Sequence, residues 1–380
     1  MNIESFAGFI AELCAYSLIV PECPLRWTII ANPGAGGFTI SRRWKEHRET
    51  LKAAVRKACG ANKKRKDSGA SQTALNAEGN PKELSAPGLI ATRDSGHAGR
   101  ITGDLLREAS AEAAAETGAE TPVQPPLHLI ICAGGDGTSL EVLSCLHNAP
   151  PELRDRFVIL RLPMGTGNDG ADSRNLAEAL DLLVLPTEPA KIPALRLTTS
   201  IEGKGPFLAF NILSVGLDAF VTHMTNKMKG KFPGDSYKLW VDIASLLYDK
   251  VYKVGPMEIH VFDDKNTGRQ ILRETPLLLA FGASGRRSYG SGKQILPDDR
   301  NVCIIRQMPL LRKLALKNLI MTGHHADKAE SLFFNAPRIE FWGREPILAQ
   351  MDGETVLIQR ADFPLTIELT EPSIQILRRT

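Results

Sequence analysis

A glycine-rich loop directly after an apolar segment is the feature that most constrains this sequence. The apolar residues 127–132 precede Ala-Gly-Gly-Asp-Gly-Thr-Ser-Leu-Glu-Val at positions 133–142, which predicts a buried strand, a tight loop and then a helix. Glycines at such a junction let backbone N–H groups close around an anion, and the helix directs its positive end to the same point. Asp136 alone would repel a phosphate, so its position also predicts a cation or a sugar hydroxyl. The segment therefore predicts a nucleoside triphosphate site.

The length and composition of the chain fit a soluble enzyme of two domains. The chain has 380 residues, of which 43% are hydrophobic and 23% charged, and this length predicts more than one core. The formal net charge of +3 is too small to predict nucleic-acid binding. The six cysteines show no C-x-x-C pairing, which predicts reduced thiols in a cytosolic protein.

The first half of the chain alternates strand-like and helix-like segments. The strand-like segments are 26–31, 89–92, 127–132 and 157–162, and glycine-rich loops follow three of them. This alternation predicts a parallel sheet with helices on both faces, and in such sheets the ligand crevice lies at the carboxyl ends of the strands. We therefore predict a Rossmann-like three-layer α/β domain that binds the nucleotide.

After about residue 190 the strand-like segments are short and separated by turns, which predicts a mainly antiparallel β-sandwich domain. These segments are 194–199, 207–213, 257–262, 277–281, 302–306, 338–342 and 366–369. We expect the active site in a cleft between the two domains. The predicted divisions are an N-terminal segment at 1–23, the nucleotide domain at 24–190, the β domain at 191–370, and a return to the first domain at 371–380.

Two further segments are assigned on their composition. Residues 5–20 are apolar and carry Glu12, which predicts a surface helix that lies on the protein or, alternatively, on a membrane. After a predicted helix at 41–58, residues 59–88 are polar and small, which predicts an insertion or flexible loop. Its basic run at 63–66 is interpreted as solvated, with a membrane contact as the alternative.

Two motifs have competing interpretations when they are considered alone. The G-x-G-x-x-G string at 165–170 follows a strand, but no acidic residue ends a following strand at the distance that a dinucleotide site requires. Asp352-Gly353-Glu354 fits a hairpin turn. It also fits a pair of carboxylates, one of which could take the proton of an attacking hydroxyl. No G-x-x-x-x-G-K-[ST] motif is present, which excludes a P-loop protein.

Seven segments in their order and approximate spacing resemble the diacylglycerol kinase catalytic-domain family. They are Asn32–Gly36, Thr92 with 96–98, Gly134–Glu141, Pro163–Asp169, Val215–Ala219, Tyr289–Gly292 and Met351–Glu354. The superfamily includes bacterial lipid kinases, sphingosine and ceramide kinases and, more distantly, NAD kinases and phosphofructokinases. The resemblance covers about residues 25–375 and leaves the lipid substrate open.

The resemblance implies a set of residues that bind ATP. The loop at Asn32–Gly36 would lie against the phosphates, two threonine hydroxyls would contact the nucleotide, and Gly134–Leu140 would form the main phosphate loop. Asp136 would have a second possible role as a base, as in sphingosine-kinase-like relatives. The implied residues are Asn32, Pro33, Gly34, Ala35, Gly36, Thr92, Gly134, Gly135, Asp136, Gly137, Thr138, Ser139, Leu140 and Thr166.

The resemblance also implies the catalytic and metal residues. Glu354 would accept the proton of the lipid hydroxyl, with Asp352 beside it. Asp299 would bind a structural Mg²⁺ together with the carbonyl groups of Leu296 and Asn301. The sequence departs from the family here, because Arg300 replaces a glycine and the loop is shortened.

We therefore predict an ATP- and Mg²⁺-dependent lipid kinase that transfers the γ-phosphate to the hydroxyl of diacylglycerol or a related lipid. We expect it in the cytoplasm and peripheral to the membrane, with a lipid substrate at the membrane surface, no nucleic-acid partner and a homodimer as one option. The alternatives are a NAD kinase-like enzyme for a soluble substrate and a non-catalytic module that binds nucleotide or lipid.

Overall fold

The computed structural model describes residues 2–19, 25–67, 87–116, 126–165, 168, 170–173, 175–228, 248–253, 255–263, 268–289 and 292–379. They form two compact units. Unit 1 consists of Met1–Ile192 and Pro372–Thr380, and unit 2 of Pro193–Glu371. Each unit is described by itself.

Unit 1 is built on a six-stranded sheet of order β2-β1-β3-β4-β20-β5. All neighbouring strands are parallel except β20 and β5. Every residue of β3 and β4 is buried, which is typical of parallel strands that are covered on both faces. The strands are β1 (Leu25–Ala31), β2 (Gly88–Ala91), β3 (Leu127–Gly134), β4 (Phe157–Pro163), β5 (Thr187–Ile192) and β20 (Ile374–Arg379).

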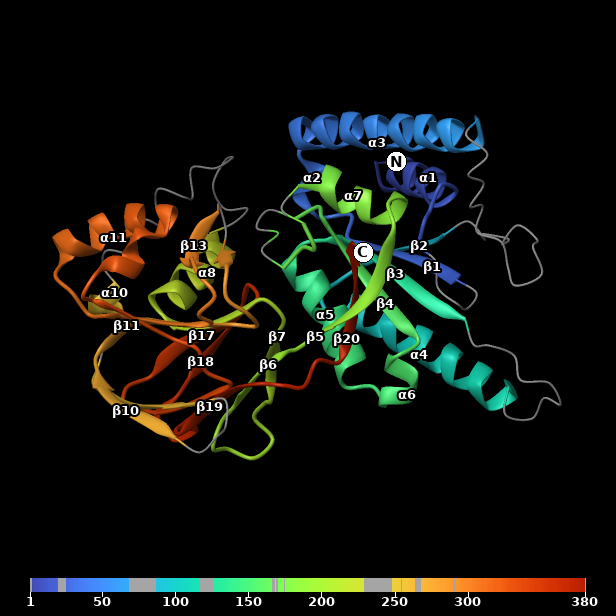
Figure 1. Ribbon diagram of the computed structural model, residues 1–380. Helices are drawn as coiled ribbons and strands as arrows, with labels where there is room; N and C mark the ends of the chain where they lie inside the picture. The colour runs from blue at the N-terminus through green and yellow to red at the C-terminus, as the bar shows by residue number, and fades with distance from the viewer. Residues whose placement is uncertain are drawn as a thin grey trace. The chain divides into compact units, whose positions relative to one another are not determined.

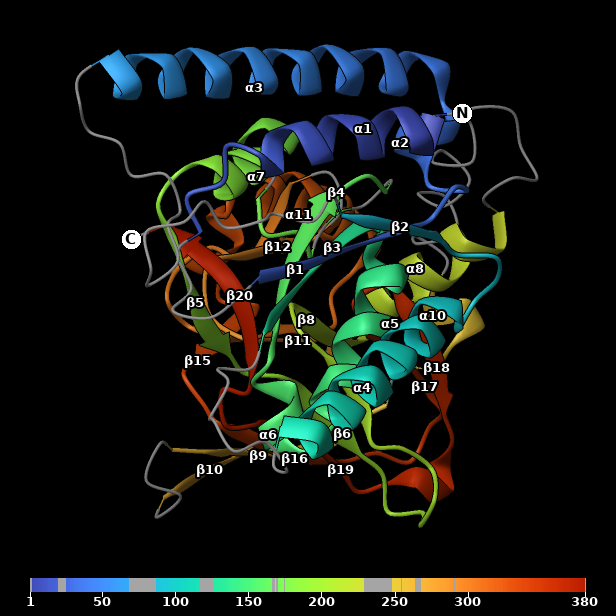
Figure 2. The same cartoon turned by 90° about the vertical axis from the view of Figure 1, so that its right-hand side faces the viewer.

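Helices cover both faces of this sheet, so that unit 1 has three layers (Figures 1 and 2). One face is covered by α1 (Asn2–Cys14), α2 (Gly36–Thr39), α3 (Ser41–Asp67) and α7 (Leu176–Val184). The other is covered by α4 (His97–Glu116), α5 (Asp136–His147) and α6 (Pro151–Arg154). Alternate residues of the strands, such as Leu129 and Ile131, contact the first helical layer, as the two-residue period of a strand requires.

The helix predicted near the N-terminus is confirmed and packs on the protein, whereas the next predicted helix is longer than expected. The N-terminal segment forms α1, in which Phe6, Ile10 and Leu13 are fully buried and contribute to the core of unit 1. The helix predicted to end at 58 continues to Asp67, because alanine, lysine and arginine favour a helix and Gly60 alone does not end one. Residues 68–86 of the predicted insertion lie outside the described residues.

Unit 2 contains two six-stranded sheets that share one hydrophobic core. Their orders are β10-β9-β16-β19-β6-β7 and β15-β14-β11-β8-β17-β18, and the recorded pairs within both are antiparallel. The first sheet contains β6 (Leu195–Thr198), β7 (Phe207–Ala209), β9 (Met257–Phe262), β10 (Arg269–Glu274), β16 (Arg338–Trp342) and β19 (Leu365–Leu369). The second contains β8 (Ile212–Gly216), β11 (Pro276–Gly282), β14 (Val302–Arg306), β15 (Ser331–Phe334), β17 (Ile347–Met351) and β18 (Glu354–Ile358).

The second sheet of unit 2 has helices on its other face. A second core lies between this face and three helices, which are α8 (Leu217–Met228), α10 (Tyr248–Val251) and α11 (Leu310–Thr322). Phe220 of α8, Tyr248 of α10 and Leu316 of α11 belong to it. The remaining elements are the hairpin of β12 (Arg287–Tyr289) and β13 (Lys293–Leu296), and the short helices η1 (His324–Asp327) and η2 (Arg360–Asp362). Among the described helices, none is long and apolar enough to span a membrane.

The predicted order of a parallel α/β region followed by an antiparallel β-rich region is confirmed. Within it, the single strand predicted at 207–213 is divided into β7 and β8. A turn at Phe210 and Asn211 separates these two strands, and the carboxylate of Asp352 accepts hydrogen bonds from its N–H groups.

Candidate functional site

The loops after β1 and β3 are joined by the side chain of Asn32. Its Oδ1 accepts a hydrogen bond from the Gly34 N–H at 2.9 Å, and its Nδ2 donates to Thr138 Oγ1 at 3.3 Å. The Asn32 N–H donates to the Ala133 carbonyl at 2.9 Å. Because β1 and β3 are parallel neighbours, their carboxyl ends bring these two loops together, as the sequence predicted for the edge of this sheet.

Glycines allow the loops after β3 and β4 to approach more closely than side chains would permit. A Cβ atom on Gly165 would lie 2.4 Å from the Gly135 Cα, and one on Gly134 would lie 2.6 Å from Thr138 Oγ1. The loop after β1 also reaches this point, because the Gly37 N–H donates to the Met164 carbonyl at 2.8 Å. Three loops therefore meet here through backbone atoms, which suits an anion that is bound by N–H groups.

Helix α5 begins at this junction. Its first intrahelical hydrogen bond runs from the Ser139 N–H to the Gly135 carbonyl at 3.1 Å, so that the N–H groups before it lie at the open end of the helix. Such an end carries a partial positive charge and binds anions. The N-terminal end of α4 differs, because its N–H groups already have an acceptor. Those of Gly96 and Ala98 donate to the Glu141 carboxylate at 2.6 and 3.0 Å. The glycine-bordered end of α5 is therefore the better phosphate site of the two.

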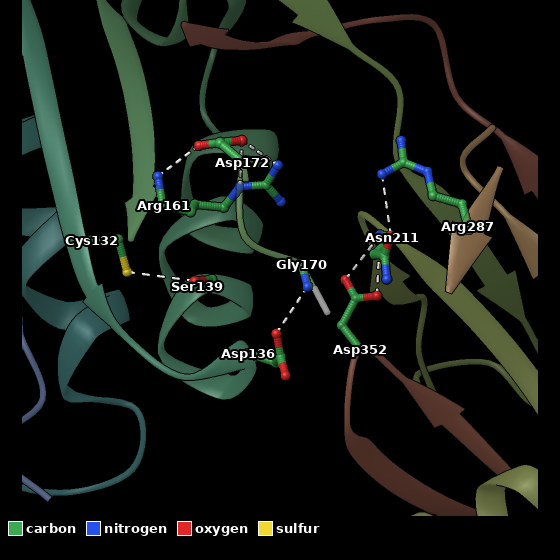
Figure 3. Close-up of polar contacts among 9 residues, drawn as sticks. All are labelled: Cys132, Asp136, Ser139, Arg161, Gly170, Asp172, Asn211, Arg287 and Asp352. Carbon is green, nitrogen blue, oxygen red and sulfur yellow. Dashed lines mark hydrogen bonds and ion pairs between the residues drawn. The ribbon is translucent and has the colours of Figure 1, made fainter. Parts of the chain in front are cut away.

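Asp136 is the first residue of α5 and links it to the loop after β4 (Figure 3). Its Oδ1 accepts a hydrogen bond from the Gly170 N–H at 2.9 Å. A carboxylate in the first turn of a helix is also stabilised by the helix dipole. Asp136 thus orders the polypeptide around the junction of the glycine loops.

A buried ion pair between Arg161 and Asp172 holds the other part of the same loop (Figure 3). Arg161 Nε and Nη2 donate to Asp172 Oδ1 at 3.0 and 2.6 Å, and the Arg161 N–H donates to Oδ2 at 2.6 Å. Both side chains are almost completely buried. Sequence reasoning missed this pair, although an arginine inside the apolar run 157–163 was a signal, because a buried charge requires a partner.

The predicted nucleotide residues occupy different positions around this junction. Three of the predicted segments lie at the carboxyl ends of neighbouring strands. The buried Thr92 follows β2, Asn32–Gly36 follows β1, and Gly134–Thr138 begins at the end of β3. Ser139 is buried, and its Oγ lies 3.7 Å from Cys132 Sγ on the strand β3 (Figure 3). Leu140 is partly exposed on α5. Thr166 lies outside the described residues.

In unit 2, Asp352 holds the turn that divides β7 from β8. Asp352 itself lies between β17 and β18 with a φ of 45°. Its carboxylate accepts hydrogen bonds from the N–H groups of Phe210 at 2.5 Å, Asn211 at 3.1 Å and Ile212 at 2.9 Å. Figure 3 shows its contact with Asn211. Glu354, the first residue of β18, is exposed. Of the two predicted catalytic carboxylates, Asp352 is thus engaged by the backbone, and Glu354 faces solvent.

A polar cluster of Ser214 on β8, Asp218 on α8 and Gln350 on β17 connects to the turn that contains Asp352. Ser214 Oγ and Gln350 Nε2 donate to Asp218 Oδ2 at 2.6 and 3.2 Å. Gln350 Oε1 accepts the Gly353 N–H at 2.9 Å, which connects the cluster to the Asp352-Gly353 turn. Burial raises the pKa of the Asp218 carboxyl. The sequence signal was the segment Val215–Ala219, to which no role was assigned.

The carboxylates at the predicted magnesium loop are paired with arginines. Arg286 donates to Asp299 from Nε at 2.6 Å and from Nη2 at 3.3 Å, and it lowers the pKa of that carboxyl. Arg300 Nε donates to Asp298 Oδ1 at 3.0 Å and lowers its pKa likewise.

Of the two carbonyl groups that the resemblance implied as metal neighbours, that of Asn301 accepts a backbone hydrogen bond. The Asn301 carbonyl accepts the Gly282 N–H at 2.7 Å, and Leu296 pairs with Arg287 in the β12–β13 hairpin. Among the described residues, no group of three or more histidine, cysteine, aspartate or glutamate side chains could hold a metal ion. Because guanidinium groups already neutralise both carboxylates, these donors do not fit a Mg²⁺ ion in this arrangement. The assignment of Asp299, Leu296 and Asn301 to a metal stays a prediction.

Comparisons with known proteins agree with the resemblance. Residues 26–186 match the family described as diacylglycerol kinase catalytic domain. The chain is 25% identical over 236 residues to "Probable lipid kinase YegS-like" of Xanthomonas euvesicatoria, a match that covers 60% of this chain and 72% of the relative. A protein of the same name from Pseudomonas fluorescens is 26% identical over 236 residues, with 59% and 68% covered.

Solved structures show a likeness of fold. The crystal structure named "a putative diacylglycerol kinase" from Bacillus anthracis strain Sterne aligns with a TM-score of 0.54 and 18% identity, over 93% of this chain and 94% of that one. The predicted resemblance to the diacylglycerol kinase catalytic-domain family is confirmed by the match of residues 26–186 to the model of this family and by the lipid kinase names of the relatives.

Proposed function

We propose that this protein is an ATP-dependent lipid kinase that transfers the γ-phosphate of ATP to the hydroxyl group of diacylglycerol or a related lipid. The catalytic-domain match and the lipid kinase names of its relatives support this substrate class. We further propose a cytoplasmic enzyme that attaches to the membrane surface. ATP would enter with Mg²⁺, which neutralises phosphate charge when it is bound.

The observation that carries the proposal is the meeting of glycine loops at the open end of α5. Gly135 and Gly165 approach within a distance that leaves no space for a Cβ atom. N–H groups and a helix end gathered in this way can bind the β- and γ-phosphates without side-chain charges. Asn32, Asp136 and the Arg161–Asp172 pair fix the loops, so that little reorganisation accompanies binding.

The proposed chemistry needs a proton acceptor for the lipid hydroxyl. The hydroxyl oxygen forms a bond to the γ-phosphorus, the bond from that phosphorus to the β–γ bridging oxygen breaks, and ADP leaves. The hydroxyl proton passes to Glu354, whose carboxylate is exposed in unit 2. Asp352 positions the turn from which Glu354 extends. The proposal requires the phosphate loops of unit 1 and Glu354 of unit 2 to reach one substrate.

The test is transfer of radiolabelled γ-phosphate in mixed micelles that contain diacylglycerol, sphingosine, ceramide or, separately, NAD. We expect one of the lipids to be labelled and NAD to remain unlabelled. Labelled NAD would instead support the soluble-substrate kinase. ATP binding without turnover on any acceptor would support a non-catalytic module, and either result overturns the proposal.

The glycine junction can be tested with a matched pair of variants. Gly165→Ala adds a Cβ atom where the Gly135 Cα lies 2.4 Å away, whereas Gly60→Ala adds one in open space. We expect Gly165→Ala to weaken ATP binding, measured by calorimetry, and Gly60→Ala to leave it unchanged. Equal ATP affinity in both variants would show that the junction is not the phosphate site.

A further inference from the structure

Helix α11 exposes an apolar face to solvent. The exposed fractions of its side chains are 50% for Leu310, 80% for Leu311, 48% for Leu314 and 40% for Met321. Lys313 and Leu316 on the opposite side are buried, and Leu316 belongs to the core that α11 shares with the underlying sheet. Because residues three, four and seven apart lie on one side of a helix, the exposed side chains form a single stripe.

Many of the large hydrophobic side chains that are exposed in the described residues lie in this stripe. Ten large hydrophobic side chains are exposed among the described residues, and four of them belong to α11. A fifth, Val251 with 62% exposed, belongs to α10, which Lys313 of α11 joins through an ion pair with Asp249. A soluble protein rarely leaves such a group of residues in water, so that the stripe indicates a binding surface.

The charges around the stripe select the kind of partner. Residues 310–322 contain no acidic residue, and Lys313 within them is buried in an ion pair with Asp249. Arg312 is exposed and pairs with Glu330, and Lys253 beside α10 is exposed and lies 3.4 Å from Glu345. Exposed pairs of this kind contribute little and can exchange for a lipid phosphate. An anionic bilayer offers acyl chains to the leucines and lipid phosphates to the exposed arginine and lysine side chains.

We propose that the exposed stripe of α11, together with Val251 of α10, is the surface by which this protein docks on an anionic lipid bilayer. Leu310, Leu311 and Leu314 enter the boundary between headgroups and acyl chains, and Arg312 contacts lipid phosphates. This deepens the proposed function and rests on it for its purpose, because a kinase for a membrane lipid must reach its substrate in the bilayer. Docking itself requires no phosphate transfer.

The experiment measures binding to vesicles without nucleotide. The full chain is sedimented with vesicles of equal parts phosphatidylcholine and phosphatidylglycerol, and with vesicles of phosphatidylcholine alone. We expect stronger binding to the anionic vesicles, and a loss of about tenfold or more in Leu311→Asp/Leu314→Asp, because two apolar side chains no longer enter the bilayer. The matched control is Ile271→Asp, which changes a side chain 49% exposed on β10, away from α11 in Figures 1 and 2. We expect this control to bind as the original chain does.

A second readout follows insertion directly. In Leu311→Trp, the added indole should shift its emission to shorter wavelength on anionic vesicles, and in Ile271→Trp it should not. The proposal is overturned if the aspartate variants bind vesicles as tightly as the original chain, or if the Leu311→Trp emission does not change. It is also overturned if the original chain ignores vesicles and forms a dimer that Leu311→Asp/Leu314→Asp dissociates.

The proposed surface and the proposed kinase activity fail in different ways. If the protein is a lipid kinase and α11 its docking surface, Leu311→Asp/Leu314→Asp should lose activity on substrate in vesicles and keep it on a short-chain diacylglycerol dissolved in water. Vesicle binding through α11 without phosphate transfer to any lipid would refute the kinase and retain the surface. Loss of activity on both substrate forms, with vesicle binding intact, would refute the surface.

Discussion

Asp136 in unit 1 and Asp352 in unit 2 each precede a glycine, and they hold the backbone in different ways. Asp136 accepts the N–H group of Gly170 and is the first residue of a helix. Asp352 accepts three consecutive N–H groups and stands in a turn at positive φ. The same two-residue pattern therefore begins a helix in one unit and forms a turn at positive φ in the other.

This difference changes the interpretation of the Asp-Gly-Glu segment. A carboxylate that receives three backbone N–H groups cannot take up a proton without weakening those bonds. Glu354 extends from the end of the turn and is exposed. The comparison supports the proposal that Asp352 positions the turn and that Glu354 accepts the proton, and the following variants separate these roles.

The largest effect is expected for Glu354→Gln. Removal of a general base costs about 10²- to 10⁴-fold in kcat, whereas the exposed position predicts almost no change in the free energy of unfolding. Phosphate transfer in micelles and urea unfolding measure the two quantities, with Glu202→Gln at another exposed position as the control. Full activity of Glu354→Gln would move the base elsewhere, with Asp136 as the first candidate.

Asp352→Ala is expected to affect stability most. Three N–H groups at residues 210–212 lose a charged acceptor, which should lower the free energy of unfolding of unit 2 by about 3 kcal/mol. Activity should fall with it, because Glu354 loses its position. Asp352→Asn keeps one acceptor oxygen and should recover part of the stability in urea unfolding. An Asp352→Ala protein with original stability and no activity would indicate that Asp352 acts in catalysis directly.

Asp136→Ala should change stability less than Asp352→Ala, because Asp352 accepts three consecutive N–H groups. A decrease of about 1 kcal/mol is expected from the hydrogen bond to Gly170. The dissociation constant for ATP should rise, since the loop after β4 is no longer held against α5. Calorimetric titration with ATP measures this. If Asp136→Ala proves as unstable as Asp352→Ala, the two aspartates play the same structural role and the contrast is wrong.

The contrast between local and distant contacts also explains what the sequence could predict. The loops at Asn32 and Gly134 follow from apolar runs that end in glycines, which is a local pattern. The division of β7 from β8 depends on Asp352, which is about 140 residues away in the chain, and no local pattern records it. The edge strand β10 was missed because its residues are mostly exposed and lack a hydrophobic alternation. Strand β5 contains Pro189, which disfavours a strand except at an edge, where β5 lies.

The partners of charged groups are also difficult to predict from the sequence, because they can lie far away in the chain. The carboxylates of the magnesium loop were identified from their order in the chain. Their arginine partners were not, although Arg300 stands inside the predicted loop. Arg286 adopts a φ of 56° and reaches Asp299 from another loop. Pairing of this kind depends on where two loops meet, which only the fold determines.

A smaller, pH-dependent effect is expected from Asp218, which supports the Asp352 turn. Burial raises the pKa of Asp218 in the folded state above its value in the unfolded chain, so that the folded state binds the proton more readily. As the pH rises from about 4 through the raised pKa, this carboxyl therefore lowers the free energy of unfolding. Asp218→Asn should remove that part of the slope. Urea unfolding of both proteins at a series of pH values measures the difference. Parallel pH profiles would show that Asp218 is not buried.

The smallest effect is expected where charge is exposed, at Asp299 and Arg286. The guanidinium group neutralises the carboxylate, and exposed pairs contribute little to stability, so that Arg286→Gln should lower the Tm only slightly. Addition of EDTA or of Mg²⁺ without nucleotide should leave the Tm of the original chain unchanged. An increase of the Tm with Mg²⁺ that Asp299→Ala abolishes would show that the metal displaces the arginine. The prediction of Asp299 as a metal ligand would then be supported, and the carbonyl groups of Leu296 and Asn301 would remain its predicted neighbours.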